Sequence, residues 1–294
     1  VRIGLEQTRY DFAGEHRPGG LVKALRYKIG YTDYQHIEYA AETTPGTKFS
    51  SNGFDSRIEA VHERIGRFDG ALGVQLKRFT FSAMGAEGFL PVTATRSAAL
   101  FLYEETTLGP LKLSGGARGE SVRVGAEEDP RFGDARTRSF APRSGSLGAL
   151  YTLSREYAVA FSGSYTERAL TYQELFANGR HLATRAFEVG DATLGKERST
   201  AFDLALRKQA GPLTGSLGVF YNRFRDFVTL VPTGADDGDP DHPLPVYAYR
   251  HLPAAFRGAE ATLSYIAYDR GGRRIVLEAR ADTTRATDRS TGRP

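Results

Sequence analysis

Six histidine and carboxylate side chains of this chain stand where they could bind a divalent cation. His36 and Glu38 are two residues apart in a segment of alternating polarity, so a β-strand would place both on one face. The same face would carry Arg26, Lys28 and Thr32, which makes it polar. Imidazole and carboxylate bind Zn²⁺ and release it more readily than thiolates do. We interpret the pair as candidate metal ligands, with a polar pair that binds no metal as the alternative.

The other four candidates lie in two long polar segments. His181 is followed by Glu188, and Asp237 and His242 belong to the acidic run ADDGDPDH. A histidine near a carboxylate can capture a metal, and an acidic loop attracts cations before they bind specifically. The alternatives are a solvent-exposed loop histidine and a solvated acidic loop, since the acidic run lacks the spacing of a calcium-binding loop.

Composition excludes several classes of function. The chain of 294 residues has no cysteine, which excludes disulfides and thiolate metal sites. Its net charge of +4 comes from interleaved acidic and basic residues, which argues against a nucleic-acid partner. Neither a nucleophile elbow nor a phosphate-binding glycine loop is found, so we expect no enzymatic activity. No apolar run reaches the ~18 residues of a transmembrane helix, although a transmembrane β-strand needs only ~10 residues of alternating polarity.

Alternating polarity recurs along the chain and predicts the β-strands that must position these candidates. In residues 111–120, 157–166, 213–221 and 275–282, apolar or aromatic residues alternate with small, polar or charged ones. In the last segment, Glu278, Arg280 and Asp282 share one face, which we expect to line a polar lumen. The 33 glycines, 15 tyrosines and 18 phenylalanines also favour strands and turns.

Short and long connections alternate between the expected strands. Glycine-bearing turns such as GRFDG and DRGG alternate with long connections at Ala40–Asn52, Ala83–Thr95, Ser121–Arg143, Glu167–Ser199 and Thr233–Leu252. Outer-membrane barrels show this alternation, because their periplasmic turns are short and their external loops are long. We predict an all-β fold, an antiparallel up-and-down transmembrane β-barrel with about twelve strands present. A soluble β-sandwich that serves as a binding or adhesion module is the alternative.

The segment from Thr166 reads TERALTYQELFANGRHLAT, and AFEVG and LGKERS follow. It resembles TonB-dependent outer-membrane receptors, specifically the ZnuD-like branch associated with zinc uptake. Further matching segments are GYTDYQHIEYA at Gly30–Ala40, FSAMGAEGFLP at Phe81–Pro91 and VFYNRFRDFV at Val219–Val228. Leu170 and Arg180 stand where the family pattern has proline, so a cation lies beside His181.

The resemblance implies the remaining functional expectations. Residues 1–294 would form part of a single receptor β-barrel, about 12 of 22 strands, with the plug domain and the signal peptide upstream. Such a receptor lies in the bacterial outer membrane, contacts its lipid and draws energy from the TonB–ExbB–ExbD system. It would import zinc or a zinc complex, with no prosthetic group, and the resemblance gives His181 a role in capture. A siderophore or haem receptor is the alternative within this class, and an outer-membrane enzyme or a passive porin stays open.

Overall fold

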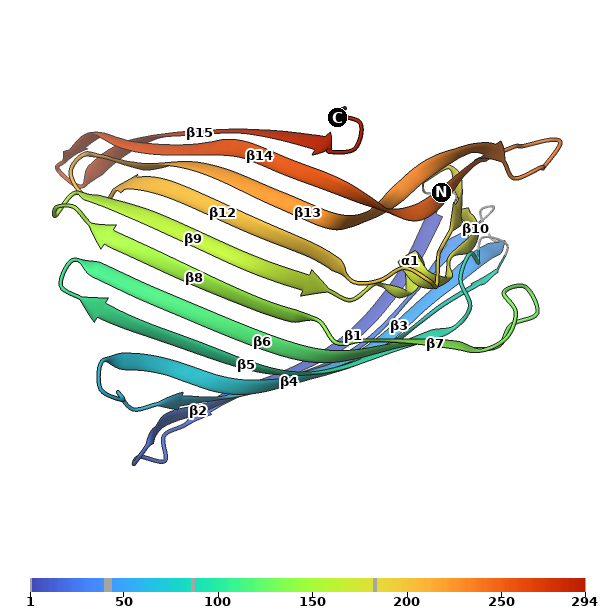
Figure 1. Cartoon of the computed structure of the whole chain (residues 1–294), viewed down its shortest axis with the longest axis horizontal. Coiled ribbons are helices and arrows are strands. Elements are labelled where there is room, and N and C mark those ends of the chain that lie inside the picture. The colour runs from blue at the N-terminus through green and yellow to red at the C-terminus, as the bar shows by residue number, and fades with distance from the viewer. Residues whose placement is uncertain (1, 40–43, 86–87, 182–183, 294) are drawn as a thin grey trace.

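The chain forms one large curved β-sheet. The computed structural model describes residues 2–39, 44–85, 88–181 and 184–293, and fifteen strands of these residues belong to the sheet. Figure 1 shows it as an open trough, with short turns at one end of the strands and the longer connections at the other. Twelve strands of ten residues or more make up the wall: β1 (Arg2–His16), β2 (Val22–Tyr39), β3 (Pro45–His62), β4 (Phe68–Gly85), β5 (Thr93–Leu108), β6 (Leu111–Ala126), β8 (Arg143–Thr152), β9 (Tyr157–Arg168), β12 (Glu197–Lys208), β13 (Leu213–Asp236), β14 (Pro245–Arg270) and β15 (Arg273–Asp288).

The wall is an antiparallel meander in chain order, which confirms the predicted up-and-down topology. Each of the twelve long strands pairs with the next long strand along the chain, from β1 to β15. Three short strands lie in the connections: β7 (Arg136–Phe140), β10 (Asn178–His181) and β11 (Ala186–Val189). One pairing differs from the prediction, since β11 pairs with β14 in parallel. The reason is that the β9–β12 connection folds back onto the start of β14.

Most connections at the longer-loop end are shorter than the sequence suggests. β3 already begins at Pro45, β13 runs to Asp236, and β14 begins at Pro245. The strands continue because ladder hydrogen bonds join backbone groups and do not require alternating side chains. A bilayer needs only ~10 residues of tilted strand, so β13 and β14, with 24 and 26 residues, are long enough to project beyond one. The connection between β9 and β12 remains long.

One face of the sheet is an exposed apolar band. Leu76, Leu100, Leu204 and Val219 are about half exposed there, and many other large apolar side chains share this exposure. Cross-strand register keeps the band continuous, because Leu204 lies directly opposite Val219. Such a surface would be unstable in water and matches the lipid-facing side of a barrel wall.

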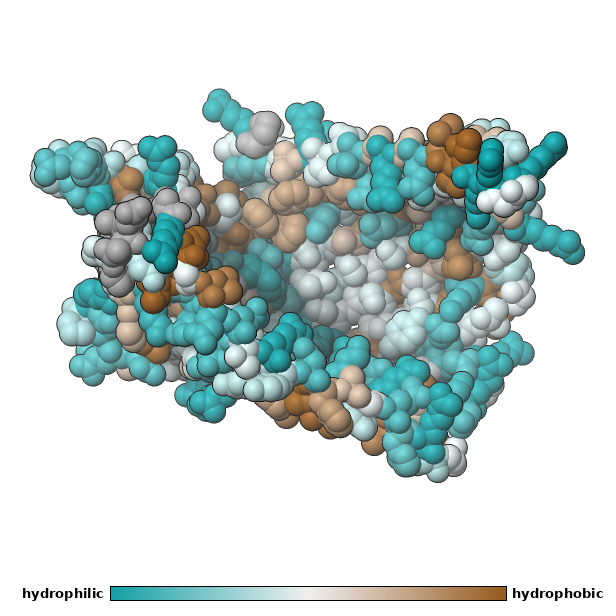
Figure 2. All heavy atoms as spheres, turned by 180° about the vertical axis from the view of Figure 1, so that it is seen from behind, coloured by the Kyte–Doolittle hydropathy of each residue, from teal (hydrophilic) through white to brown (hydrophobic). Residues whose placement is uncertain are grey.

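The opposite face is polar and lines the hollow of the trough. Glu278, Arg280 and Asp282 lie on it, opposite polar residues of β14, as predicted. Figure 2 looks into the hollow, where residues of hydrophilic and intermediate hydropathy predominate. A β-sandwich would bury its apolar faces between two sheets, and the described part of the chain contains a single sheet. The barrel prediction is confirmed, and the sandwich alternative is wrong.

The buried core lies where the β9–β12 connection packs against the wall. This connection contains α1 (Tyr172–Phe176), which contacts β5 and β6. Among the described residues, no helix is long and apolar enough to cross a membrane. The core consists of Phe89, Leu90, Val122, Val124, Ala126, Phe140, Leu170, Leu175, Phe176, Ala177 and Val228. Only a packed core restrains side chains from several sides, so the connection is where functional groups can be held rigidly.

Candidate functional site

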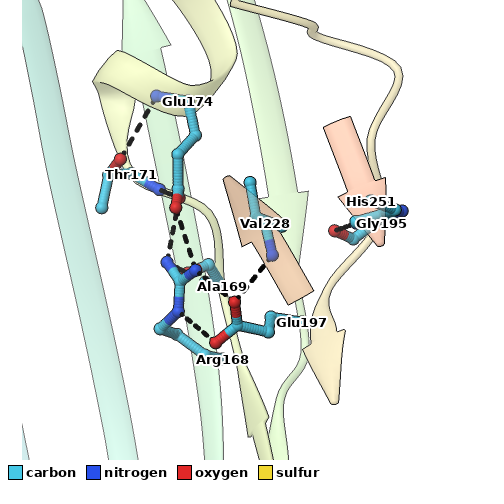
Figure 3. A network of polar contacts seen from close by, with 8 residues as sticks. All are labelled: Arg168, Ala169, Thr171, Glu174, Gly195, Glu197, Val228 and His251. Carbon is cyan, nitrogen blue, oxygen red and sulfur yellow. Dashed lines mark hydrogen bonds and ion pairs between the residues drawn. The ribbon is translucent and has the colours of Figure 1, made fainter. Parts of the chain in front are cut away.

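Arg168, the last residue of β9, anchors the folded connection (Figure 3). Its guanidinium contacts the carboxylates of Glu174 on α1 and Glu197 on β12 through four nitrogen–oxygen distances of 2.9–3.0 Å. Glu197 also accepts a hydrogen bond from the backbone N–H of Val228 on β13, at 2.9 Å. One cation therefore joins the entry of the connection, its helix and its exit.

Thr171 and Glu174 form a capping box at the start of α1. The Thr171 hydroxyl accepts a hydrogen bond from the Glu174 N–H at 3.3 Å, and the Glu174 carboxylate accepts one from the Thr171 N–H at 2.7 Å. Two N–H groups at the helix start are thereby satisfied. Sequence reasoning missed this clamp, although the T-x-x-E spacing of a capping box is visible in LTYQEL. Glu174 and Glu197, the acidic residues of the motif before and after His181, thus have a structural role.

Two glycines allow the connection to pack closely. A Cβ at Gly179 would lie 2.9 Å from Phe89 Cα, and one at Gly190 would lie 2.7 Å from the backbone nitrogen of Ala177. The same proximity gives two backbone hydrogen bonds, from the Asn178 N–H to the Phe89 carbonyl at 2.9 Å and from the Gly190 N–H to the Ala177 carbonyl at 2.7 Å. Packing therefore requires glycine at both positions.

His181 ends β10 and is held on two sides. Its ring stacks on Phe89, with centroids 4.3 Å apart and ring planes at 11°. Its Nδ1 lies 2.8 Å from Glu188 Oε1, and the Thr184 hydroxyl donates to the same oxygen at 2.8 Å. The Glu188 side chain is 3% exposed and that of His181 is 26% exposed. No hydrogen bond joins His181 Nε2 to another described residue, so this nitrogen can take a ligand.

Hydrogen bonds keep Glu188 ionised in spite of its burial. Burial raises the pKa of a carboxyl group, yet hydrogen bonds from His181, Thr184 and Tyr249 hold the pKa of Glu188 below its ordinary value. Burial and the charge of Glu188 raise the pKa of Tyr249 on β14, so its phenol stays protonated. An ionised carboxylate at Nδ1 selects the tautomer with a proton on Nδ1 and a lone pair on Nε2.

Arg180 on β10 forms ion pairs with two aspartates of the acidic run. Its Nε lies 2.7 Å from Asp237 Oδ2, out of line for a hydrogen bond, and its Nη1 lies 2.9 Å from Asp239 Oδ2. Its Nη2 donates to the His242 carbonyl, and Asp237 accepts the Leu244 N–H at 3.0 Å. Asp237, a predicted ligand, is therefore neutralised by Arg180 and closes the β13–β14 connection. The predicted ligand His242 is exposed and takes part through its carbonyl.

His36 and Glu38 meet on β2, as the alternation predicts. His36 Nε2 lies 3.6 Å from Glu38 Oε1, and both side chains are partly buried. The His36 ring stacks on Phe49 of β3, with centroids 4.6 Å apart, and Tyr34 packs against it. His36 Nδ1 is buried and has no hydrogen-bond partner among the described residues. Buried polar atoms are seldom left unpaired, so Nδ1 is an unsatisfied group of this pair, while Nε2 is the ring nitrogen that faces Glu38.

Comparison with known proteins agrees with this architecture. A family model described as TonB dependent receptor-like, beta-barrel matches residues 2–293. The chain belongs to this family. Among solved structures it is similar to the copper transporter OprC, with a TM-score of 0.79 and 16% identity over 99% of this chain and 46% of that one. It is also similar to the FrpB iron transporter from Neisseria meningitidis, F5-1 variant (TM-score 0.69, 13% identity, 96% and 45% covered), and to the Serratia marcescens hemophore receptor HasR, solved with its hemophore HasA and heme (TM-score 0.67, 17% identity, 90% and 46% covered). At these identities the likeness concerns the fold, and the chain spans less than half of each structure.

In this TonB-dependent receptor barrel, four of the six candidate residues form two separate pairs, His36 with Glu38 and His181 with Glu188, and Asp237 and His242 belong to neither. Over the described ranges, no three histidine, aspartate or glutamate side chains converge as a metal site. The two rings are nevertheless linked by packing, because Phe49, beneath His36, packs against the core that contains Phe89, beneath His181. His251 on β14 contacts the carbonyl of Gly195 at 3.2 Å (Figure 3). Both pairs thus lie beside the core at the longer-loop end of the receptor.

Proposed function

We propose that the chain is the barrel portion of a bacterial outer-membrane receptor that imports a metal ion or metal complex with energy from TonB. The family and the apolar outer face support the membrane location, and the two histidine–carboxylate pairs support a metal cargo. The longer connections then face the exterior, and the short turns face the periplasm. The plug domain and the contact with TonB–ExbB–ExbD would belong to the upstream part of the protein. Its activity is transport and not enzymatic catalysis.

From the geometry of the two pairs we infer different roles for them toward a zinc ion. Two ligands of a tetrahedral Zn²⁺, each at about 2.1 Å, lie roughly 3.4 Å apart. His36 Nε2 and Glu38 Oε1, separated by 3.6 Å, have the spacing of two ligands of one ion. His181 Nδ1 and Glu188 Oε1, separated by 2.8 Å, have the spacing of a hydrogen bond. Glu188 therefore orients His181, whose Nε2 is the ligand.

Sites with one or two protein ligands suit a transported ion. A four-ligand site would hold Zn²⁺ too tightly for onward transfer, whereas one imidazole, or one imidazole and one carboxylate, leaves positions for water and releases the ion readily. The His181–Glu188 hydrogen bond is the observation that carries the proposal, because it fixes an imidazole with an available Nε2 on a buried anion. We infer that zinc, free or as a complex, is the cargo.

The test uses the full-length receptor. The double variant His36→Ala/His181→Ala should lose most zinc binding in calorimetry and most zinc-dependent growth in chelator-treated medium. His16→Ala, which removes an exposed histidine at the short-turn end, is the matched control and should change neither. Glu188→Gln should weaken zinc affinity by roughly 10–100-fold, the usual cost of losing an orienting partner. Unaltered uptake in the double variant would show that the pairs do not handle the metal.

Haem is the second candidate cargo, because an available imidazole nitrogen can also serve as an axial ligand of haem iron. Titrating haem into the receptor and recording the absorbance spectrum of the haem distinguishes a haem cargo from a zinc cargo. Haem binding that is lost in His181→Ala, together with zinc affinity that is unchanged in the double variant, would identify a haem receptor. If His181→Ala still binds haem and the double variant has lost zinc binding, zinc is identified as the cargo.

A further inference from the structure

Arg185, at the turn between β10 and β11, has a backbone conformation that the chain otherwise gives to glycine. Its φ is 53°, and every other described residue with a positive φ is a glycine. The left-handed region is open to glycine and disfavoured for other residues, because their Cβ approaches the following carbonyl oxygen. The turn therefore holds Arg185 under backbone strain.

The β10–β11 hairpin imposes this conformation. The Thr184 N–H donates to the His181 carbonyl at 3.2 Å and closes the turn, and Ala186 then pairs directly with His181. Arg185 is the extra residue between the closed turn and that first pair. Such a residue is left-handed in hairpin bulges, where glycine is preferred. Glycine would remove the strain, so a role for the arginine side chain explains why the strain is present.

The Arg185 side chain is an available cation beside the proposed metal ligand. Residue 185 adjoins the residue that pairs with His181, so their Cα atoms lie roughly 6 Å apart. Arg185 is exposed, and no hydrogen bond or ion pair joins it to another described residue. Arg180, on the other side of His181, is instead engaged by Asp237 and Asp239. Arg185 can therefore bind an anion that arrives at His181.

We propose that Arg185 is a specificity-determining residue, which binds a carboxylate of an anionic zinc chelate while the zinc binds His181 Nε2. This inference rests on the proposed function and deepens it, because it selects a chelate over the bare ion. One imidazole leaves three positions of a tetrahedral Zn²⁺ for a small chelator. A polycarboxylate chelator fills them with oxygen atoms and keeps negative charge, which a guanidinium binds through charge-assisted hydrogen bonds. A bare zinc ion gains nothing from a neighbouring cation.

Calorimetry on the full-length receptor compares three probes: zinc alone, zinc bis-glycinate, which is neutral, and zinc citrate, which is anionic. Arg185→Gln should bind zinc citrate about tenfold more weakly, the low end for a hydrogen bond to a charged group because the site is exposed. It should bind the other two probes like wild type. Arg185→Lys keeps the charge without the planar fork of the guanidinium, and it should recover part of the affinity. Arg155→Gln is the matched control, because it removes an exposed arginine from the β8–β9 turn at the opposite end of the wall, and it should bind all three probes like wild type.

Arg185→Gly tests the side chain and the backbone together. Glycine removes the strain, so the amides of residues 186–190 should exchange with deuterium about fivefold more slowly than in the wild type. The affinity for zinc citrate should nevertheless fall as far as in Arg185→Gln. A purely structural arginine would show neither change.

Four results overturn the proposal: wild-type affinity of Arg185→Gln for zinc citrate, an equal loss for all three probes, an equal loss in Arg155→Gln, or unchanged exchange in Arg185→Gly. Haem also carries carboxylates, and weaker haem binding by Arg185→Gln with unchanged zinc citrate binding would overturn a zinc chelate as the ligand. His181→Ala keeps this proposal apart from the proposed function. Zinc binding that survives in His181→Ala refutes the metal role of that histidine, whereas unchanged zinc citrate binding in Arg185→Gln refutes the role of Arg185 alone.

Discussion

Replacing Arg168 by glutamine should open the β9–β12 connection while the wall stays folded. The change removes the cation between Glu174 and Glu197, whose side chains are only 11% and 12% exposed. Each carboxylate then keeps one backbone partner, the N–H of Thr171 or of Val228. The wall is held by its own ladder hydrogen bonds, so the loss of stability is confined to the connection.

The expected loss of stability follows from how far Arg168 and its two carboxylate partners are exposed to water. Removing one partner of a buried ion pair costs ~3–5 kcal/mol. The Arg168 side chain is 38% exposed, so water screens part of the interaction and the expected cost is halved, to about 2 kcal/mol. Since 1.4 kcal/mol corresponds to a factor of ten, the open population of the connection should rise about 30-fold. Burial alone would lower the pKa of Arg168, but the two carboxylates raise it, so its charge persists at all working pH values.

Hydrogen–deuterium exchange on the full-length receptor measures this opening. Amides of residues 172–177 and 186–190 should exchange about 30-fold faster, and those of β8 and β9 should not change. Arg57→Gln is the matched control, because Arg57 pairs with Glu59 at 3.0 Å on the open wall, away from the connection. Adding Glu174→Gln to Arg168→Gln should recover part of the loss by removing one unpaired charge. Unchanged exchange in the connection, or a uniform increase along the wall, would refute the anchoring role.

Three other expectations concern the same end of the molecule. Gly190→Ala should destabilise the connection by ~1–3 kcal/mol through overpacking, because its Cβ would lie 2.7 Å from a backbone nitrogen. Gly119→Ala is the control and should not destabilise it, because the space around its Cβ is open. The protease resistance of the connection tests both variants. The pKa of Glu188 lies below its ordinary value of 4.5, so its ionised form stabilises the connection above that pH and the stabilisation is lost as the pH falls through the folded-state pKa. Pepsin cleavage of residues 184–196 between about pH 3 and 6 should show this loss in the wild type and not in Glu188→Gln. Glu38→Gln should lower zinc affinity by roughly tenfold in calorimetry, because it weakens a direct ligand, and equal affinity would show that Glu38 does not bind the ion.

The sequence predicted the wall well because alternation is a local property. Each strand shows its two faces in its own residues, and this gave the twelve long strands, the apolar band and the lumenal position of Glu278, Arg280 and Asp282. Strand ends were less predictable. Paired backbones continue past the last alternating residue, so β13 and β14 extend into the segment expected to be loop. His36 and Glu38 also met as expected, since their proximity requires only the period of one strand.

Only the tertiary structure decided what the motif residues do. Arg168 contacts Glu197, and Arg180 contacts Asp237 and Asp239, across long sequence separations that the packing of the connection brings together. The sequence by itself determined the kind of wall, because side-chain period and polarity are fixed within each strand. Which charges meet across strands depends on register and on how one connection packs, and these are set by all the backbone pairings together.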